Sequence, residues 1–162
     1  MQLEGSCHCG SVSFTVSSAQ PRPFNLCYCS ICRKTAGGGG YAINLGADYE
    51  TLKVRGEENI SVYRALIDNP ETGEKQESPG QRHFCKKCAS ALWLWDPRWP
   101  ELVHPFASVI DTDLPLPLQR THMMLNSKAA WVEVHAGPND QRFEEYPQES
   151  LAQWHQRHGF ED

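Results

Sequence analysis

Residues 5–10 read GSCHCG, and the two cysteines in this stretch belong to a set of seven that falls into three tight clusters. The clusters are Cys7 with Cys9, Cys27 with Cys29 and Cys32, and Cys85 with Cys88. A structural zinc ion takes four protein ligands, whereas a catalytic zinc ion keeps three and leaves its fourth position to water or substrate. Seven cysteines divide into four and three, which predicts two zinc ions, one closed and one open.

The two cysteine pairs are suited to the closed site. Cys7 and Cys9 would reach one ion from the same face of an extended segment, because alternate side chains of such a segment point the same way. Cys85 and Cys88 have the CxxC spacing from which zinc knuckles are built. An ion that joins the pairs would determine the fold, since structural zinc contributes about 10–16 kcal/mol in model peptides.

The remaining cluster, CxCxxC from Cys27 to Cys32, predicts an extended segment followed by a helical turn that aims three sulfurs at one point. Three thiolates and one zinc ion carry a charge of about −1 and leave an opening for a fourth ligand. A soft site prefers a soft donor, and zinc binding lowers the pKa of an incoming thiol. We therefore expect an exogenous thiol to bind there.

The spacing alone leaves other arrangements open. Cys27 and Cys29 could join Cys85 and Cys88, leaving Cys7, Cys9 and Cys32 as the smaller set. Each CxxC could also be a redox dithiol or a pair of inert buried cysteines. Four cysteines could hold an iron–sulfur cluster, although the other three would then have no evident use.

The composition is that of a globular protein, and we expect a single domain over residues 1–162. Lys and Arg number 15 against 20 Asp and Glu, for a net charge of −5, which disfavours a nucleic-acid partner. No apolar run approaches the ~20 residues that span a bilayer, so no membrane association is expected. Clustered cysteines are typical of metal sites in a reducing compartment, and the predicted location is cytoplasmic.

The strand signals predict a mainly β fold with two short helices. Residues 10–16 alternate apolar and polar side chains at the period of a half-buried strand. Further strands are expected at residues 41–45, 52–55, 61–66, 91–95, 103–110, 122–125 and 131–135. A short helix is expected at Ser30–Ala36, ended by the glycines of residues 37–40, and another after Pro147, ended by Gly159. Residues 68–80 read as a solvated loop or hairpin extension.

Several stretches of the chain resemble the glutathione-dependent formaldehyde-activating enzyme family, which includes the centromere protein V domain. They read GSCHCG at residues 5–10, CYCSICRK at 27–34 and RHFCKKC at 82–88. Residues 121–128 (THMMLNSK), 130–131 (AW) and 154–159 (WHQRHG) are similar to that family's C-terminal half. The resemblance extends over nearly the whole chain.

The resemblance implies a β-tent fold, in which several short antiparallel sheets surround a structural zinc and a short C-terminal helix follows. It also implies that Cys7, Cys9, Cys85 and Cys88 hold that zinc, and that Cys27, Cys29 and Cys32 hold a second, catalytic and labile zinc. The implied activity is that of a carbon–sulfur lyase, in which the glutathione thiolate attacks formaldehyde or another small aldehyde near the second zinc.

Some residues outside the clusters bear on this hypothesis. Arg33 and Lys34 follow the open cluster and are candidates to bind the carboxylates of glutathione, although cations also suit the end of a helix without any ligand. His122 is a candidate acid or base, or a structural histidine. Ala89 stands where the family has glycine after its CxxC, and a positive φ there would strain alanine by roughly 1–2 kcal/mol.

Two other functions are compatible with the sequence. The domain could be a non-catalytic zinc-binding module for a protein or nucleic-acid partner. Alternatively, Cys27, Cys29 and Cys32 could release zinc on oxidation, as a zinc or redox sensor does.

Overall fold

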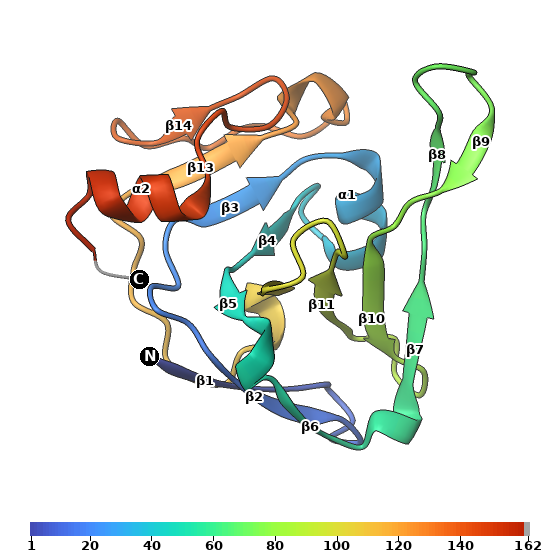
Figure 1. Ribbon diagram of the computed structural model, residues 1–162. Coiled ribbons are helices and arrows are strands. Elements are labelled where there is room, and N and C mark those ends of the chain that lie inside the picture. The colour runs from blue at the N-terminus through green and yellow to red at the C-terminus, as the bar shows by residue number, and fades with distance from the viewer. Residues whose placement is uncertain (161–162) are drawn as a thin grey trace.

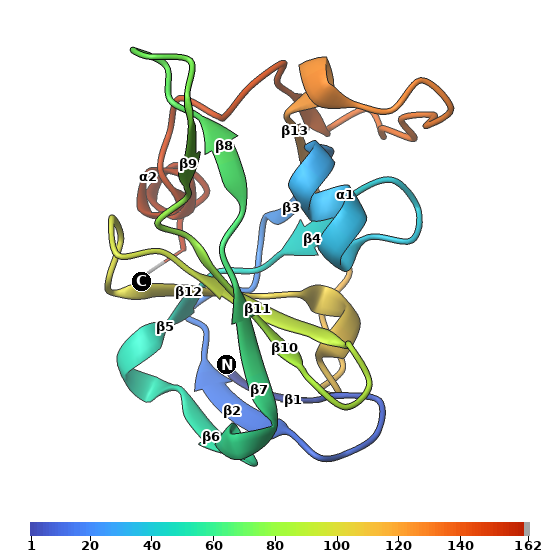
Figure 2. The same ribbon diagram turned by 90° about the vertical axis from the view of Figure 1, so that its right-hand side faces the viewer.

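The computed structural model describes residues 1–160 as three small β-sheets arranged around a shared interior, with a separate hairpin that projects from one side (Figures 1 and 2). The last two residues of the predicted single domain, 161 and 162, lie outside the described residues. This arrangement confirms the expected mainly β fold of several small sheets.

Each sheet joins segments that are far apart in the sequence. The first has the order β1-β2-β6: Gln2–Ser6, Ser13–Ser17, Lys53–Arg55. The second has the order β5-β12-β11-β10-β7: Ala47–Asp48, Leu102–Pro105, Ala91–Trp95, Gln81–Cys85, Ile60–Tyr63. The third has the order β14-β13-β3-β4: Gln141–Arg142, Arg120–Met123, Phe24–Cys27, Ala42–Asn44. The hairpin consists of β8 and β9: Leu66–Asp68, Lys75–Glu77.

The core lies where the first two sheets face each other, and it includes cysteines from both sets, although Cys9 is exposed. Phe14 and Val16 of β2 are buried while their polar neighbours are less so, as the alternation predicted. The ring of Phe14 meets that of Trp93 edge-on, with centroids 5.2 Å apart. Cys27, Cys32 and Cys85 are buried in the same cluster of side chains, so the metal-site candidates and the core are built from one set of contacts.

Strand β13 makes the third sheet mixed rather than purely antiparallel, because it pairs in parallel with both β3 and β14. In this register Met123 is the partner of Cys27, and the backbone N–H of Tyr28 donates to the Met123 carbonyl at 3.0 Å. The start of the open cluster is therefore held by a strand from the C-terminal third of the chain.

The prediction of a strand at residues 131–135 is wrong, because these residues form no strand. The ammonium of Lys128 donates to the carbonyls of Ala129 and Val132 at 3.3 and 2.8 Å, and the N–H of Val132 donates to Ala129 in a turn. These backbone groups therefore have local partners rather than a neighbouring strand.

Other strand predictions differ in their bounds. The strand expected at residues 103–110 ends at Pro105 and is followed by the 3-10 turn Ala107–Val109. That expected at residues 61–66 ends at Tyr63, and the one at residues 10–16 begins only at Ser13. Apart from the hairpin, five strands of the described residues were not predicted: β1, β3, β5, β10 and β14.

Both predicted helices are present. Helix α1 spans Ser30–Ala36, as expected. Helix α2 spans Leu151–Arg157 and begins with a capping box between Ser150 and Gln153. Neither helix within residues 1–160 has the length and apolar character that a membrane-spanning segment requires.

Residues 68–80 belong in part to the β8–β9 hairpin, whose strands are mostly exposed and stand clear of the sheets in both views (Figures 1 and 2). This confirms the expectation of a hairpin extension.

Candidate metal centres and the groove between them

Four sulfurs form one cluster: two come from the turn after β1, and two from the end of β10 and the turn that follows it. The Sγ atoms of Cys7, Cys9, Cys85 and Cys88 all lie within 4.8 Å of one another. Cys7 Sγ is 3.6 Å from Cys9 Sγ, which is 3.8 Å from Cys85 Sγ. A tetrahedral zinc ion with Zn–S bonds of about 2.3 Å separates its sulfurs by about 3.8 Å, and the two separations quoted are close to this value.

Two turns, rather than an extended segment, bring these sulfurs together. Cys7 follows the end of β1, and the N–H of Gly10 donates to the Cys7 carbonyl at 3.0 Å. Gly10 has a φ of 75°, which glycine adopts at little cost. The prediction that Cys7 and Cys9 lie on an extended segment is therefore wrong, although both sulfurs do reach one site.

The second turn is the knuckle that follows β10. The N–H of Ala89 donates to the Cys85 carbonyl at 2.8 Å, and the N–H of Cys85 donates to the Ser90 carbonyl at 2.9 Å. Ala89 has a φ of 62°, in the left-handed region that favours glycine. The knuckle thus keeps the expected geometry and carries the strain that the sequence predicted for alanine.

Hydroxyl groups support the ionised form of the outer two sulfurs. The Ser90 hydroxyl lies 3.2 Å from Cys88 Sγ, and its hydrogen bond is the main cause that lowers the pKa of Cys88 to about 5. The Ser11 hydroxyl, 3.3 Å from Cys9 Sγ, likewise lowers the pKa of Cys9. Burial instead raises the pKa of Cys7 to about 11. A full set of four thiolates therefore requires a cation.

The other three cysteines form a second cluster, in which the Sγ atoms of Cys27, Cys29 and Cys32 lie within 4.8 Å of one another. Cys27 ends β3, Cys29 caps α1 and Cys32 lies in the first turn of that helix. The Sγ of Cys29 accepts the N–H of Cys32 at 3.3 Å. This confirms the predicted extended segment followed by a helical turn, and it excludes the alternative that Cys27 and Cys29 group with Cys85 and Cys88.

Negative charge in this cluster concentrates on one sulfur. Hydrogen bonds from the thiols of Cys27 and Cys32, together with the backbone of α1, lower the pKa of Cys29 to about 2. The hydrogen bond to Cys29 raises the pKa of Cys27 far above its usual range. Three thiolates at this spacing repel one another, so a metal cation is what would allow all three to ionise.

Arg82 of β10 supplies a positive charge at the edge of this cluster. Both terminal nitrogens of its guanidinium lie 3.7 Å from Cys32 Sγ. Arg82 was part of a motif that the sequence analysis quoted, but no role was predicted for it. No local pattern relates it to Cys32, because the two residues meet only through the packing of α1 against the second sheet.

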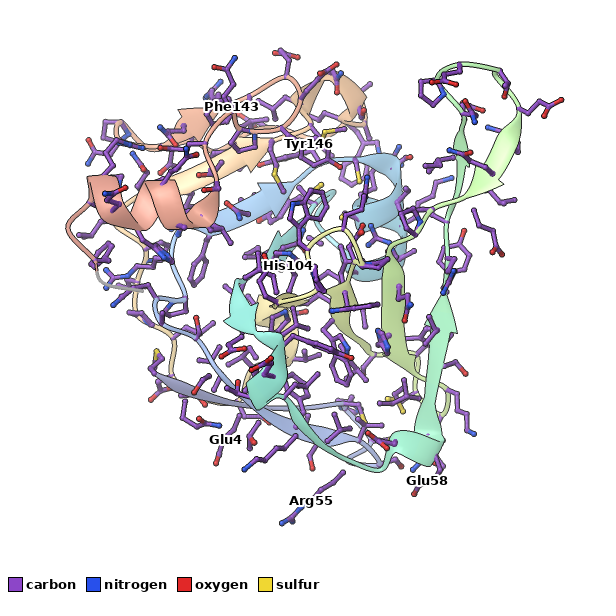
Figure 3. All side chains as sticks on the ribbon, in the orientation of Figure 1. Glu4, Arg55, Glu58, His104, Phe143 and Tyr146 are labelled. Carbon is purple, nitrogen blue, oxygen red and sulfur yellow. The ribbon has the colours of Figure 1, made fainter. Side chains whose placement is uncertain are left out.

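Tyr146, which the sequence analysis also missed, lies near the end of β3 (Figure 3). The segment before it is held by the N–H of Met124, which donates to the Glu145 carbonyl at 3.0 Å. Although 68% of the residue is exposed, desolvation of the phenol raises the pKa of Tyr146, and Coulomb interactions with Cys27, Cys29 and Cys32 raise it further. The phenol is thus electrostatically coupled to the three-cysteine cluster.

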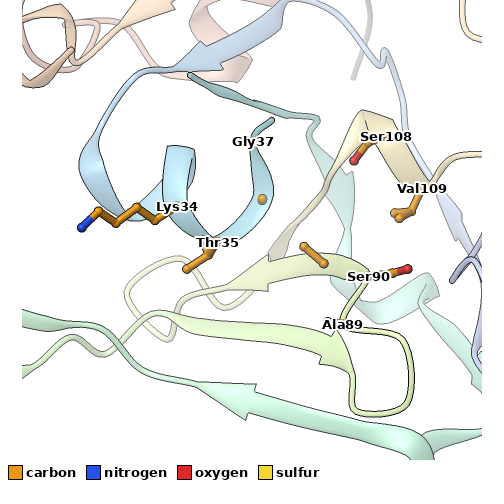
Figure 4. Close-up of a pocket in the computed structure, with 9 residues that line it drawn as sticks. Lys34, Thr35, Gly37, Ala89, Ser90, Ser108 and Val109 are labelled. Carbon is orange, nitrogen blue, oxygen red and sulfur yellow. The ribbon is translucent and has the colours of Figure 1, made fainter. Parts of the chain in front are cut away.

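A groove of about 400 Å³ separates the end of α1 from the knuckle (Figure 4). Residues from both sides line it: Lys34, Thr35, Ala36, Gly37, Ala89, Ser90, Ala91, Ser108, Val109. A second hollow of about 260 Å³ shares Thr35, Ala89 and Ala91 with the groove and extends to Arg82. The two hollows together connect the surroundings of one cysteine cluster with those of the other.

Of the other candidate residues predicted from the sequence, some line the groove and others are buried elsewhere in the fold. Lys34 lines the groove. The Nε of Arg33 is buried and, within residues 1–160, has no hydrogen-bond partner. His122 is buried and bonded to Tyr28 and Asp140 rather than lining the groove. A Cβ on Gly37 would lie 2.1 Å from the Tyr41 carbonyl oxygen, so this glycine permits a close backbone approach at the groove.

Comparison with known proteins gives consistent matches. The sequence model of the family described as "Glutathione-dependent formaldehyde-activating enzyme" matches residues 2–138. A Halomonas elongata protein named "Putative glutathione-dependent formaldehyde-activating enzyme" is 61% identical over 162 residues, which cover 100% of this chain and 99% of that protein. A crystal structure of a Rhodobacter sphaeroides protein matches with a TM-score of 0.54 and 25% identity, covering 69% of this chain and 91% of the other.

Proposed function

Because the chain belongs to the glutathione-dependent formaldehyde-activating enzyme family, we propose that it is a zinc-dependent carbon–sulfur lyase that acts on adducts of glutathione with formaldehyde or another small aldehyde. The family name implies an enzyme with glutathione and formaldehyde as substrates. The reaction class, the metal and the roles of individual residues are the content of this proposal.

The observation that carries the proposal is the unequal division of the cysteines. Four sulfurs can complete a tetrahedron, whereas the set of Cys27, Cys29 and Cys32 leaves one position for another ligand. Zinc bound by these three residues would accept the glutathione sulfur as its fourth ligand and stabilise it as a thiolate at neutral pH. The residues fit zinc because soft thiolate donors in sets of three and four are typical of catalytic and structural zinc sites.

In the reaction, the glutathione sulfur forms a bond to the carbonyl carbon while the carbonyl oxygen takes up the proton that the thiol released. Arg82, beside Cys32, balances negative charge around the sulfurs. The Tyr146 phenol is suited to donate a hydrogen bond to the oxygen as negative charge develops on it. In the reverse direction the hydroxyl proton of the adduct passes to solvent while the phenol keeps its hydrogen bond to the oxygen, and the carbon–sulfur bond breaks with its electron pair going to the sulfur.

Binding of the tripeptide is assigned to the groove. Glutathione carries two carboxylates at physiological pH, and Lys34 supplies a cation on the groove wall. Arg33 precedes Lys34 on the same helix and is a second candidate because a guanidinium suits a carboxylate, although its Nε is buried and the residue does not line the groove. The cluster of Cys7, Cys9, Cys85 and Cys88 is assigned to a structural zinc that fixes the opposite wall.

The proposal is tested by exchange spectroscopy with ¹³C-formaldehyde and glutathione. The zinc-loaded protein is expected to accelerate interconversion of formaldehyde hydrate and S-hydroxymethylglutathione above the rate in buffer. The matched control is Cys29→Ser, which removes one ligand of the open cluster and leaves the four-cysteine cluster intact. It is expected to give the buffer rate.

A wild-type protein that contains two zinc ions per chain and gives no more than the buffer rate would remove this substrate pair. Acceleration that persists in Cys29→Ser would instead remove the three-cysteine cluster as the reactive centre.

A further inference from the structure

Three buried polar side chains form a continuous chain of hydrogen bonds behind the open cluster. The Tyr28 hydroxyl lies 2.8 Å from His122 Nδ1, and His122 Nε2 lies 3.0 Å from Asp140 Oδ2. Tyr28 and His122 are each 1% exposed, and the side chain of Asp140 is 3% exposed. Polar groups buried to this extent are costly unless all are paired, so the arrangement has a specific geometry.

The carboxylate at the end of this chain is held in place by further donors. The N–H of Arg120 donates to Asp140 Oδ1 at 2.8 Å, and that of Gly137 donates to Oδ2 at 3.0 Å. Since an ionised carboxylate can only accept hydrogen bonds, His122 donates from Nε2. Its Nδ1 is then left to accept the proton of the Tyr28 hydroxyl, and every group in the chain has a defined role.

Tyr28 connects this network to the metal-site candidate because it lies between Cys27 and Cys29. Successive side chains of an extended segment point to opposite sides, so the ring of Tyr28 is directed away from the two flanking sulfurs. Its backbone N–H is also bonded, to the Met123 carbonyl at 3.0 Å. Both the main chain and the side chain of this residue are therefore anchored to β13, the strand that carries His122.

The two cysteine clusters differ in their need for such support. A four-ligand site gains its geometry from the ion, because each sulfur is held by a complete tetrahedron. A three-ligand site that exchanges its fourth ligand lacks this constraint, so its sulfurs must be positioned by the protein. Hydrogen-bonded residues behind the ligands are a common way to achieve this.

We propose that Tyr28, His122 and Asp140 are positioning residues that hold the Cys27–Cys29 turn in a shape ready for metal, so that the open cluster binds its ion without reorganisation. The proposal deepens the proposed function and rests on it in one respect, that Cys27, Cys29 and Cys32 hold a metal ion. None of the three residues is assigned contact with substrate.

The experiment uses cobalt(II) in place of zinc, because the visible spectrum of cobalt bound to thiolates reports the geometry of each site. Tyr28→Phe removes only the hydroxyl. The matched control is Tyr41→Phe, which removes a hydroxyl from the ring packed 5.2 Å from that of Tyr28. The spectrum of the four-cysteine site alone is obtained from Cys29→Ser.

Tyr28→Phe is expected to bind the first cobalt ion as the wild type does, with the same spectrum. Its second ion should bind about 10–100-fold more weakly in competition with a chelator, the range found when the hydrogen-bond support of a metal ligand is lost. The visible bands of that second ion should also be altered. Tyr41→Phe should match the wild type in both respects. Asp140→Asn, measured as the rate at which a chelator removes the second ion from preloaded protein, should again show faster loss.

The outcomes separate the two proposals. A wild-type protein that takes up two ions, with a Tyr28→Phe variant of identical affinity and spectrum at the second site, overturns the positioning role and leaves the proposed function intact. A wild-type protein that takes up a single ion overturns the proposed function, and the positioning role fails with it.

Discussion

The guanidinium of Arg82 places both of its terminal nitrogens 3.7 Å from the sulfur of Cys32, and so a strand of the second sheet brings a fixed positive charge to the open cluster. Replacement by Met keeps the length of the side chain and removes the charge. Because hydrogen bonds to charged groups contribute about 1.5–3 kcal/mol, we expect Arg82→Met to lower kcat/KM for adduct formation at least about tenfold. Exchange spectroscopy at several glutathione concentrations measures this change.

Arg82→Lys is the matched control for that experiment, because it retains a cation without the planar fork. Its kcat/KM should lie between those of the wild type and Arg82→Met. Equal losses of kcat/KM in Arg82→Met and Arg82→Lys would show that the planar shape of the guanidinium, rather than its charge, matters at this position.

Tyr146 is expected to affect the reaction without affecting the metal. Tyr146→Phe removes the phenol that is coupled to the three cysteines, and loss of one well-placed donor commonly slows catalysis by about 100-fold or more. Elemental analysis should still give two zinc ions per chain. Tyr49→Phe serves as the control, since Tyr49 stacks on Trp95 in another part of the fold. A wild-type rate in Tyr146→Phe would exclude a hydrogen bond from the phenol to the reacting oxygen.

The two clusters should respond differently to the loss of a ligand. Cys85 is fully buried at the end of β10, and Cys85→Ser should destabilise the protein by several kcal/mol, because structural zinc contributes about 10–16 kcal/mol in model peptides. Cys29→Ser should retain one zinc ion and a cooperative thermal transition. Elemental analysis combined with circular dichroism tests both expectations, and a folded, zinc-free Cys85→Ser variant would contradict the structural role.

Ala89 stands at a φ of 62° in the knuckle, and relief of this strain should stabilise the protein. An L-residue in the left-handed region costs roughly 1–2 kcal/mol, part of which glycine offsets by its greater freedom in the unfolded chain. Ala89→Gly should therefore raise the free energy of unfolding by about 0.5–1 kcal/mol in zinc-saturated protein, measured by urea denaturation. Ala91→Gly, in strand β11 beside the register shift between β10 and β11, should lower it by about 0.5–1 kcal/mol. Shifts of the same sign in both variants would argue against strain at Ala89.

His104 should contribute to the dependence of stability on pH. Burial lowers the pKa of His104 below its ordinary value of 6.5, although hydrogen bonding to the Leu45 carbonyl, at 3.0 Å from Nδ1, and the charge of Asp96 oppose the shift. The unfolded chain therefore takes up a proton on this residue at a higher pH than the folded protein does. The resulting stabilisation is present above about pH 6.5 and declines as the pH falls toward the lowered pKa of the folded state.

His104→Gln keeps a donor for Leu45 and cannot titrate. The loss of stability between about pH 7 and about pH 5.5 should be smaller in this variant than in the wild type, as measured by urea denaturation. Protonation of the cysteine clusters affects both proteins equally, so the difference between them isolates His104. Identical pH profiles would show that the histidine does not titrate differently on folding.

Short-range sequence patterns were enough to predict much of the fold and the grouping of both cysteine clusters. The grouping of Cys27, Cys29 and Cys32 depends on a strand end and one helical turn, both of which are encoded within a few residues. The alternation around Phe14 and the terminal helix with its capping box are local in the same sense.

What the sequence did not predict depends on contacts between distant segments. Arg82 meets Cys32 only after α1 has packed against the second sheet, and Tyr28 meets His122 only after β3 has paired with β13. The parallel pairing of β13 with β3 likewise has no local signature. The strand expected at residues 131–135 shows the converse, because a favourable pattern forms no strand where a turn forms and the Val132 carbonyl accepts from the nearby Lys128.

The groove has one wall beside each cysteine cluster: the end of α1, the helix that Cys29 caps, forms one wall together with Gly37, and Ala89 and Ser90, directly after Cys88, form part of the other. On the proposed assignment of one zinc ion to each cluster, scarcity of zinc would act in two stages. Loss of the more weakly held ion would leave an intact but dormant protein that a renewed supply restores. Loss of the ion from the four-cysteine cluster would remove the support of the opposite groove wall. The destabilised protein could then not rebuild the three-cysteine site and would be degraded.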